Sequence, residues 1–437
     1  MEGGQPLMAA LNHRFDRVLR DQVLQAVDAL REEMVAFLQG LIRIPTINPP
    51  GDEYRAAAEF IGRQLRQFEY DVEYIAADGR PEHTPRHPRI NVIGRFQDGA
   101  AARPVLHFNG HFDVVAPGAA WTVDPFAGLI QDGKLYGRGA ADQKAGIAAS
   151  IFAVEAIRRS GVKLRGTVEQ SGTVDEESGG FAGVAYLAEH GYLQADKTDF
   201  VIITEPTYVD RICIGHRGVY WFKVIQHGRI AHGSMPHLGI NAADTLGELI
   251  YAINHSLKPL LAQRETEMPV EPAASRFASI NINSVFGGQP EDGTHTPCVI
   301  DRAGAIFDRR FLPEESFDQV RSEICDLLES LRQLNPDSRY DLEDLMVVHP
   351  TQTDPASKLI AAVSDSIETI LGSKPPLTAS PGTYDHKHVS RLAHIRDCIA
   401  YGPGIVDLAH QPDEYVVLED LVRAAKVMAL TTVRLLA

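Results

Sequence analysis

The stretch PVLHFNGHFDVV, residues 104–115, reads as a buried strand that ends in two polar residues. On an extended chain, residues two apart point to the same face, so His111 and Asp113 leave the strand end side by side. In open α/β sheets, ligands bind outside the carboxyl ends of the strands. The pair is therefore a candidate metal ligand with the carboxylate that orients it. Taken alone, a polar pair that only closes a strand is about equally common.

Predicted strands and helices alternate on both sides of this stretch. Upstream, apolar residues recur at helical spacing from about Arg14 to Ile42, which predicts one long helix or a helix pair. A second helix is expected from Tyr54 to Phe68. Downstream, the strands TVEQSGTV and DFVIITEPT each run into acidic residues. The alternation predicts an α/β fold, with a mostly parallel twisted sheet and helices on both faces.

The pattern changes after Pro206, where strand, helix, two strands and a helix follow one another. This order predicts a smaller α+β, ferredoxin-like domain that interrupts the first. A chain of 437 residues is also longer than a single core usually supports. We therefore expect a catalytic domain in two parts, residues 1–210 and 339–437, and an inserted domain over residues 211–338.

Composition argues against several classes of protein, namely nucleic-acid-binding, membrane-spanning and disulfide-rich proteins. The chain carries 42 Lys and Arg against 58 Asp and Glu, a net charge of −16, which argues against a nucleic-acid partner. No signal-like start and no apolar run of membrane-spanning length is apparent, so we expect a soluble cytoplasmic protein without a membrane partner. The four cysteines form no CxxC pair, which argues against a disulfide framework or a thiolate zinc site.

Acidic and imidazole side chains gather where the predicted strands end. They are His111, Asp113, Asp142, Asp175, Glu176, Glu177, Glu205 and, much later, His410. Carboxylates bunched at one edge of a sheet repel one another unless a cation lies among them. Imidazole and carboxylate ligands without thiolate suit zinc, with cobalt or manganese possible. A dinuclear site would need one bridging carboxylate, and a separate carboxylate to take a proton from water.

The motifs GHFDVV, GRGAADQKAG, DEESGG, TEPT and AHQPDEYV resemble those of a known family. This is the acetylornithine deacetylase and succinyl-diaminopimelate desuccinylase family of dinuclear zinc amidohydrolases, which are aminoacylase-like metallopeptidases. The resemblance extends from about Leu38 to the end of the chain. It implies the following roles: His111, Asp142 and Glu205 hold one zinc, Glu177 and His410 hold the other with Asp142 as the bridge, Asp113 orients His111, and Glu176 is the general base.

The resemblance also implies that the inserted domain is a lid through which the protein forms a homodimer. His232 matches a histidine that reaches into the partner's active site and stabilises the developing oxyanion. Arg310 matches an arginine that grips a substrate carboxylate. Its alternative role is a surface ion pair with Glu314 or Glu315. Arg217 is equally compatible with a structural and a substrate-facing role.

The chain departs from the family pattern where desuccinylases carry an Asn-Asn pair. Here residues 294–300 read THTPCVI, so the donors on the substrate side differ, and His295 is a possible substitute. Conversely, GPGIVDLAHQPDEYV is closer to acetylornithine deacetylases. The acyl group and the amine of the substrate therefore remain open.

A second departure lies in the stretch SPGTYDHKHV. It retains Gly382, Thr383 and Asp385 of the desuccinylase Gly-Thr-Ser-Asp loop, and Thr383 is a candidate substrate contact. It also contains His386 and His388. These histidines favour a rival interpretation in which the metal site acts on a different substrate.

The leading hypothesis is a dinuclear zinc hydrolase of a C–N bond, with a small-molecule substrate such as an N-acyl amino acid or a similar carboxylated amine. The rival keeps the metals but expects a dipeptidase, a carboxypeptidase, or a catabolic amidohydrolase or deaminase of an aromatic amine. A third hypothesis is a metal-free protein that only binds a ligand. The complete ligand set argues against it.

Overall fold

The computed structural model describes residues 5–99, 101–288 and 297–437. The chain divides into two compact units. The first comprises Met1–Ile214, Thr353–Leu377 and Tyr384–Ala437, and the second comprises Gly215–Gln352 and Thr378–Thr383. The second unit is therefore an insertion into the first, and each unit is described separately.

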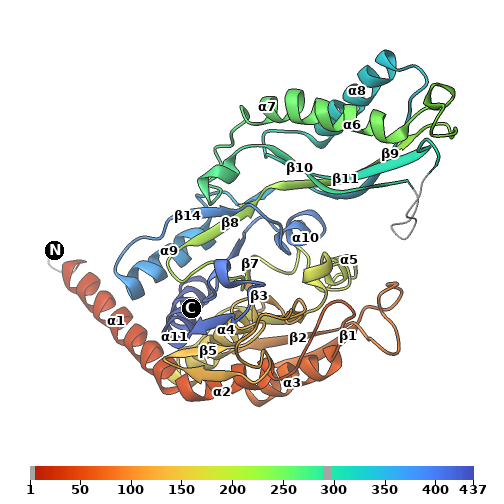
Figure 1. Cartoon of the computed structure of the whole chain (residues 1–437). Coiled ribbons are helices and arrows are strands. Elements are labelled where there is room, and N and C mark those ends of the chain that lie inside the picture. Colours follow the sequence, from red (N-terminus) through yellow and green to blue (C-terminus); the bar gives the residue numbers. More distant parts are fainter. Residues whose placement is uncertain (1–4, 100, 289–296) are drawn as a thin grey trace. The chain divides into compact units, whose positions relative to one another are not determined.

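The first unit is built on a mixed sheet (Figure 1). Its strands run in the order β1-β2-β6-β3-β7-β15, and β15 is followed by β8, along which the chain leaves the unit. The central strands β6, β3, β7 and β15 pair in parallel, whereas β1, β2 and β8 pair antiparallel. This confirms the predicted α/β class, with parallel pairing confined to the centre of the sheet. The bounds are β1 (Asp71–Ala76), β2 (Ile90–Gln97), β3 (Val105–His111), β6 (Thr167–Thr173), β7 (Phe200–Ile203), β8 (Ile212–His216) and β15 (Cys398–Ala400).

The two helical segments predicted near the start of the first unit are present. The expected helix or helix pair near the start is a pair that breaks at Leu30, and α4 packs against α11 (Figure 1). No helix in the described ranges is long and apolar enough to cross a membrane. The bounds are α1 (Gln5–Ala29), α2 (Arg31–Ile42), α3 (Tyr54–Gln67), α4 (Lys144–Ser160), α5 (Val184–Glu189), α9 (Lys358–Leu371), α10 (His386–Arg391) and α11 (Leu418–Leu436).

Strand β3 is buried along its whole length, as expected for a strand that is covered on both faces. Neighbouring residues on a strand point to opposite faces. A Cβ atom on Gly110 would meet Ile147 of α4. The side chain of Asn109 instead donates to Asp385, the residue before α10. Helices therefore cover both faces of the sheet, as predicted.

A small three-stranded sheet in the order β16-β5-β4 completes the first unit. It consists of β4 (Leu129–Gln131), β5 (Lys134–Tyr136) and β16 (Tyr415–Val417). Tyr415 pairs with Tyr136 across β16 and β5. This pairing brings the late motif AHQPDEYV next to the segment that carries GRGAADQKAG.

The second unit contains a four-stranded antiparallel sheet in the order β10-β11-β9-β12. Along the chain its elements follow the β-α-β-β-α-β succession of the ferredoxin-like fold that was predicted, although the sequence assigned only the first five of these elements to the insertion. Phe222 and Phe307 stack in its core, with ring centroids 4.9 Å apart. The bounds are β9 (Gly218–His227), α6 (Ala242–Ala252), a π turn (Ile253–Leu257), α7 (Lys258–Leu261), β10 (Ser279–Gly287), β11 (Arg302–Phe311), α8 (Phe317–Leu334), β12 (Arg339–Val348), and the short strands β13 (Thr351–Gln352) and β14 (Leu377–Ser380).

Strand β12 changes the predicted end of the insertion. The sequence LMVVHP predicts the return to the first domain, with the boundary at residue 339. In the structure β12 pairs with β9 along its length, with Val348 opposite Val219. The first unit therefore resumes only at Thr353.

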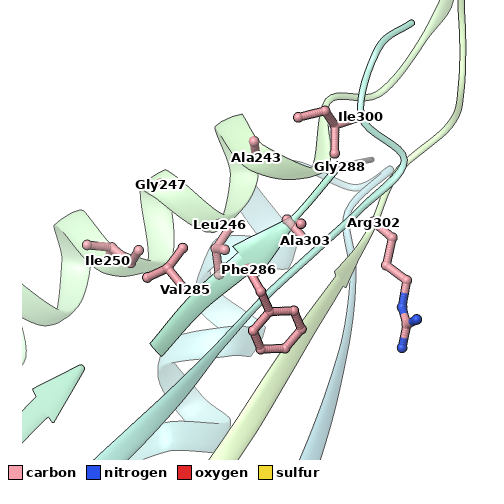
Figure 2. A pocket seen from close by; sticks show the side chains of 11 residues that line it. Ala243, Leu246, Gly247, Ile250, Val285, Phe286, Gly288, Ile300, Arg302 and Ala303 are labelled. Carbon is pink, nitrogen blue, oxygen red and sulfur yellow. The ribbon is translucent and has the colours of Figure 1, made fainter. Parts of the chain in front are cut away.

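An apolar pocket lies between α6 and the β10-β11 pair (Figure 2). Leu246 and Ile250 of α6 and Val285 of β10 are among the residues that line it. Strand β10 lies at the edge of its sheet, with Val285 59% and Phe286 41% exposed. An edge strand with exposed apolar side chains is a favourable place for another chain to pair.

Candidate metal centre

The predicted metal ligands lie in the first unit. His111 is the last residue of β3, Glu176 and Glu177 open the short 3-10 turn η1 (Glu176–Ser178) after β6, and Glu205 follows β7. Because β3 pairs in parallel with both β6 and β7, these strand ends meet at one edge of the sheet. This is the edge at which α/β sheets bind ligands.

Two further predicted ligands come from loops at the same edge. Asp142 lies just before α4. His410 lies between the 3-10 turn η5 (Val406–Leu408) and β16, and its φ of 64° places it in the left-handed region. The loop segments therefore complete a site whose other members are fixed by strands.

The donor atoms form two groups, in each of which they lie within 4.8 Å of one another. In the first group, Nε2 of His111 lies 3.1 Å from Oδ1 of Asp142 and 4.0 Å from Oε1 of Glu205. In the second, Nε2 of His410 lies 3.0 Å from Oε2 of Glu177 and 3.5 Å from Oδ2 of Asp142. The two oxygens of Asp142 thus face different histidines, which is the arrangement expected of a bridging carboxylate.

Burial and close contacts shift the protonation of these acids. Burial raises the pKa of Glu177 to about 7, although the hydrogen bond from His410 opposes the rise. Burial also raises the pKa of Glu205, and repulsion from Asp142 adds to the effect. For Asp142 burial acts in the same direction, but hydrogen bonds from His111 and His410 outweigh it and lower the pKa. The carboxylates are thus close enough to compete for neutralising charge.

The histidines respond in the opposite sense. Burial would lower the pKa of His111, but its contacts with Asp113 and Asp142 outweigh this and raise it. Hydrogen bonds to Asp142 and Glu177 raise the pKa of His410 to about 10. The nearby carboxylates therefore favour the protonated form of each imidazole, in positions where a bound cation would supply the positive charge instead.

This donor set fits two divalent metal ions. Its members are imidazole nitrogens and carboxylate oxygens without a thiolate, a combination that suits zinc and neighbouring divalent metals. Buried carboxylates at this separation are costly unless positive charge lies among them. His111, Asp142 and Glu205 could hold one ion, and Asp142, Glu177 and His410 the other.

Asp113 supports both halves of the site. Nδ1 of His111 donates to the backbone carbonyl of Asp113 at 3.0 Å, which leaves Nε2 of the neutral ring available to a metal. The carboxylate of Asp113 lies 3.4 Å from the same Nδ1 and accepts the backbone N–H groups of Glu176 and Glu177 at 3.2 and 3.1 Å. Asn48 donates to it as well, at 2.8 Å. Asp113 therefore connects the His111 strand end to the turn that carries the two glutamates.

Glu176 lies beside the two groups rather than within them. Its carboxylate is largely buried, and its Oε1 lies 3.4 Å from Nζ of Lys387. Glu177, the next residue, contacts His410 instead. Adjacent residues of the turn thus direct their carboxylates to different partners, as the division of roles between a base and a ligand requires.

Glu414 is a supporting residue that the sequence did not reveal. It is fully buried and pairs with Arg138, with 2.6 Å between Oε2 and Nη1. Its Oε1 accepts the backbone N–H groups of Gly139, Ala141 and Asp142. Glu414 belongs to the AHQPDEYV motif, and this membership is the only sign of its importance that the sequence offers. Its partners are distant along the chain, so the sequence does not indicate what it contacts.

The predicted substrate-binding arginines lie in the second unit. Arg310 pairs with Asp308, through contacts of 2.7 and 2.9 Å, and not with Glu314 or Glu315. Residues two apart on β11 share a face, which explains this choice of partner. Arg217 is buried and donates to backbone carbonyls of Phe277 and Pro381. Burial and the nearby Arg310 lower the pKa of Arg217 to about 10.

The other predicted residues of the second unit are His232, Thr383 and His295. His232 is exposed, and its Nδ1 accepts the backbone N–H of Ser234 at 3.2 Å. Thr383 is half-buried at the end of the second unit. His295 lies outside the described residues.

Known proteins resemble this chain over most of its length. The family model described as Peptidase family M20/M25/M40 matches residues 107–434. Succinyl-diaminopimelate desuccinylase of Methylorubrum extorquens (strain PA1) is 29% identical over 400 residues, which cover 89% of this chain and 95% of that protein.

Solved structures share the fold. The di-peptidase Dug1p of Saccharomyces cerevisiae matches with a TM-score of 0.73 and 19% identity, covering 95% of this chain and 98% of that one. A dinuclear metal binding peptidase of the M20 family from Bacillus subtilis matches with a TM-score of 0.66 and 16% identity, covering 93% and 98%. The extent of the family match shows that this chain belongs to peptidase family M20/M25/M40.

Proposed function

We propose that this metal-dependent amidohydrolase cleaves the amide bond of an N-acyl amino acid or a similar small carboxylated amine, in the manner of acetylornithine deacetylases, at a centre of two zinc ions. The observation that carries the proposal is the pair of ligand groups that share Asp142, with Glu176 beside them. The desuccinylase of Methylorubrum extorquens, whose name describes removal of an acyl group, supports the choice of substrate class.

The residues of the two groups would hold the metals. When bound, the ions supply Lewis acidity that polarises the amide carbonyl and makes water easier to deprotonate. Cobalt or manganese would satisfy the same donors, so zinc is the choice that the imidazole and carboxylate set favours first.

Glu176 is the general base of the proposal. Its carboxylate takes a proton from water and later delivers a proton to the leaving amine. Its neighbour Glu177 is engaged with His410, so Glu176 is the carboxylate of the pair that is left for proton transfer. Asp113 assists by holding the backbone N–H of both glutamates.

His232 is proposed to donate a hydrogen bond to the developing oxyanion in the partner subunit. Because Nδ1 accepts the backbone N–H of Ser234, the neutral imidazole carries its proton on Nε2. An exposed Nε2–H is a suitable donor for charge that appears only in the transition state.

Four residues are proposed to contact the substrate or to support its pocket. Arg310 presents a planar guanidinium that already binds the Asp308 carboxylate through two contacts, and a substrate carboxylate offers the same geometry. Thr383 and His295 belong to segments that depart from the desuccinylase pattern. Arg217, whose guanidinium is held by backbone carbonyls, is proposed to support the substrate pocket.

A peptidase is the second candidate function. Its support is the fold shared with Dug1p, which is described as a di-peptidase. The two functions would use the same metals and base, and they differ in whether the acyl group is itself an amino acid. A specialised amidohydrolase or deaminase is a further variant on the same site.

A substrate panel separates these functions. Zinc-loaded protein is incubated with N-acetyl, N-succinyl and N-formyl amino acids and with dipeptides, and the released amine is measured. We expect turnover of one or more N-acyl amino acids at least tenfold above that of the dipeptides. Turnover of dipeptides alone would replace the deacylase proposal by the peptidase.

A base variant tests the mechanism. We expect Glu176→Ala to keep its metal content and to lose turnover on the order of 10²-fold or more. Glu82→Ala, at an exposed loop position, is the matched control and should behave as the unmodified protein. Full activity of Glu176→Ala would remove Glu176 from the mechanism.

We also propose that the protein is a cytoplasmic homodimer that pairs through the second unit. Free cysteines are compatible with a reducing compartment. The exposed Val285 on the edge strand β10 suits an interface between copies.

We expect Val285→Asp to shift the mass measured by light scattering toward the monomer. Leu334→Asp, at an exposed site on α8, should leave it unchanged, and a dimer that survives Val285→Asp would place the interface elsewhere.

A further inference from the structure

Helix α10 contacts the turn that carries Glu176 through two neighbouring side chains. Nζ of Lys387 lies 3.4 Å from Oε1 of Glu176. Nε2 of His388 lies 2.7 Å from the backbone carbonyl of Gly179, at the other end of the same turn. A carbonyl only accepts, so His388 is the donor in this bond. The helix thus holds the turn at both ends, through two side chains that have no assigned role in the proposed reaction.

The start of α10 is itself held by the sheet. Asp385, the residue before the helix, is fully buried, and Asn109 of β3 donates to its Oδ2 at 3.3 Å. Asn109 accepts in turn from Ser171 of β6 at 2.7 Å. The position of Lys387 is therefore tied to the same two strands that end at the metal centre.

Burial makes the Lys387 ammonium unusual. The side chain of Lys387 is 8% exposed and that of Glu176 is 12% exposed. A buried ammonium is unfavourable unless an anion compensates it, and Glu176 supplies that charge. The separation of 3.4 Å is longer than a strong charged hydrogen bond, so the contact with Lys387 orients the carboxylate and leaves its capacity to accept a proton.

Glu176 has little else to orient its side chain. Its backbone N–H is fixed by Asp113, but among the described residues Lys387 is the side chain that contacts its carboxylate. A general base must be held within a narrow range of positions relative to the proton that it takes. The element that supplies this restraint is α10.

We propose that Lys387 is a positioning residue, which holds the Glu176 carboxylate in the orientation for proton transfer while His388 holds the turn beneath it. The inference rests on the proposed function, because it assigns Lys387 a role through the general base. Lys387 contacts no metal ligand in the described structure, so its role differs from that of Asp113.

The test uses the zinc-loaded full chain and an N-acyl amino acid that the protein turns over. Lys387→Met keeps the length of the side chain without its charge, Lys387→Arg keeps the charge, and Lys374→Met at an exposed position is the control. We expect Lys387→Met to lower kcat about tenfold or more, to change KM less than about twofold, and to keep zinc content and the unfolding midpoint. We expect Lys387→Arg to recover most of kcat. The magnitude reflects a fraction of the contribution of a general base.

Other outcomes would overturn the inference in distinct ways. A raised KM with kcat retained would make Lys387 a contact for a substrate carboxylate. A loss of zinc or of stability that parallels the loss of kcat would make its role structural, and an unchanged kcat would leave it without a role in turnover.

The Glu176→Ala background separates this inference from the proposed function. There, Lys387→Met should change the residual turnover less than about twofold, because the group that it positions is gone. If Glu176→Ala is inactive while Lys387→Met is fully active, only the positioning role fails. If Glu176→Ala is fully active, the proposed mechanism itself fails.

Discussion

The two candidate ligand groups share Asp142 and contain the same types of donor, yet they differ in how the fold supports them. His111 ends the buried strand β3 and is 1% exposed, whereas His410 lies in a loop and is 49% exposed. A strand in the middle of a sheet fixes its side chains through neighbours on both sides, and a loop at the surface has fewer such restraints. One imidazole is thus carried by a rigid strand, and the other by a more accessible loop.

The accessible half is nevertheless anchored through its backbone. Arg138 donates to the carbonyl of His410 at 3.2 Å and pairs with Glu414. Glu414 also accepts the backbone N–H of Asp142. The loop that carries His410 is therefore linked to the shared ligand, while its imidazole remains open to solvent. We expect the His410 position to exchange its metal more readily than the His111 position.

The largest expected effect removes what the two halves share. In Asp142→Ala each group keeps only two of its three donors, because the Asp142 carboxylate that both groups share is removed. We expect loss of both metals after dialysis and turnover reduced by more than the roughly 10 to 100-fold typical of residues that only support a ligand. Metal analysis by mass spectrometry and the N-acyl amino acid assay check this. Retention of two metals would show that Asp142 is not a bridge.

A smaller effect separates the halves. We expect His410→Ala to keep about one metal per subunit, because His111, Asp142 and Glu205 remain together. His111→Ala should keep less, since it leaves the largely buried Glu205 without its imidazole partner. Both variants are dialysed against the same chelator series and their metal content is compared. Equal metal loss from the two variants would mean that the difference in burial does not control affinity.

Much of this site could be predicted because its signals are local. His111 and Glu205 come just at or after apolar strands, and parallel strands bring their carboxyl ends to one edge. The alternation of strands and helices then places these ends within one unit. A strand end followed by polar residues is visible in the sequence without knowledge of any distant contact.

The supporting residues could not be predicted in this way. Lys387 and Glu176 are separated by 211 positions, and Glu414 and Asp142 by 272. Nothing in the local sequence of Lys387 indicates burial beside a carboxylate. Such pairs follow from the packing of α10 and of the His410 loop, which spacing and periodicity do not describe.

Two differences between the expectations and the structure have simpler causes. Strand β12 contains only exposed and half-buried residues, so no buried side chain marks the core to which it belongs, and its pairing with β9 assigns it to the insertion. The alternative role of Arg310, a surface ion pair with Glu314 or Glu315, places its partner after the strand. The two-residue period of β11 places Asp308 on the same face, and that period was available from the sequence.

The smallest expected effect concerns the support of the turn that carries Glu177, in the more exposed half. Burial lowers the pKa of His388 to about 3, so the folded protein holds this imidazole neutral. An unfolded chain binds the proton near pH 6.5, and the folded chain binds it only near pH 3. As the pH falls below about 6.5, the unfolded state therefore takes up more protons and the free energy of unfolding decreases, by at most about 1.4 kcal/mol per pH unit from this group.

We expect His388→Gln, whose amide can still donate to the Gly179 carbonyl, to lose less stability than the unmodified protein between pH 7 and pH 5. Urea unfolding with chelator present, so that metal release does not contribute, measures the difference, and His237→Gln at an exposed position is the control. Equal losses of unfolding free energy in His388→Gln and in the unmodified protein would mean that the acid sensitivity of this turn comes from its carboxylates. The substitution removes the imidazole and leaves the carboxylates in place.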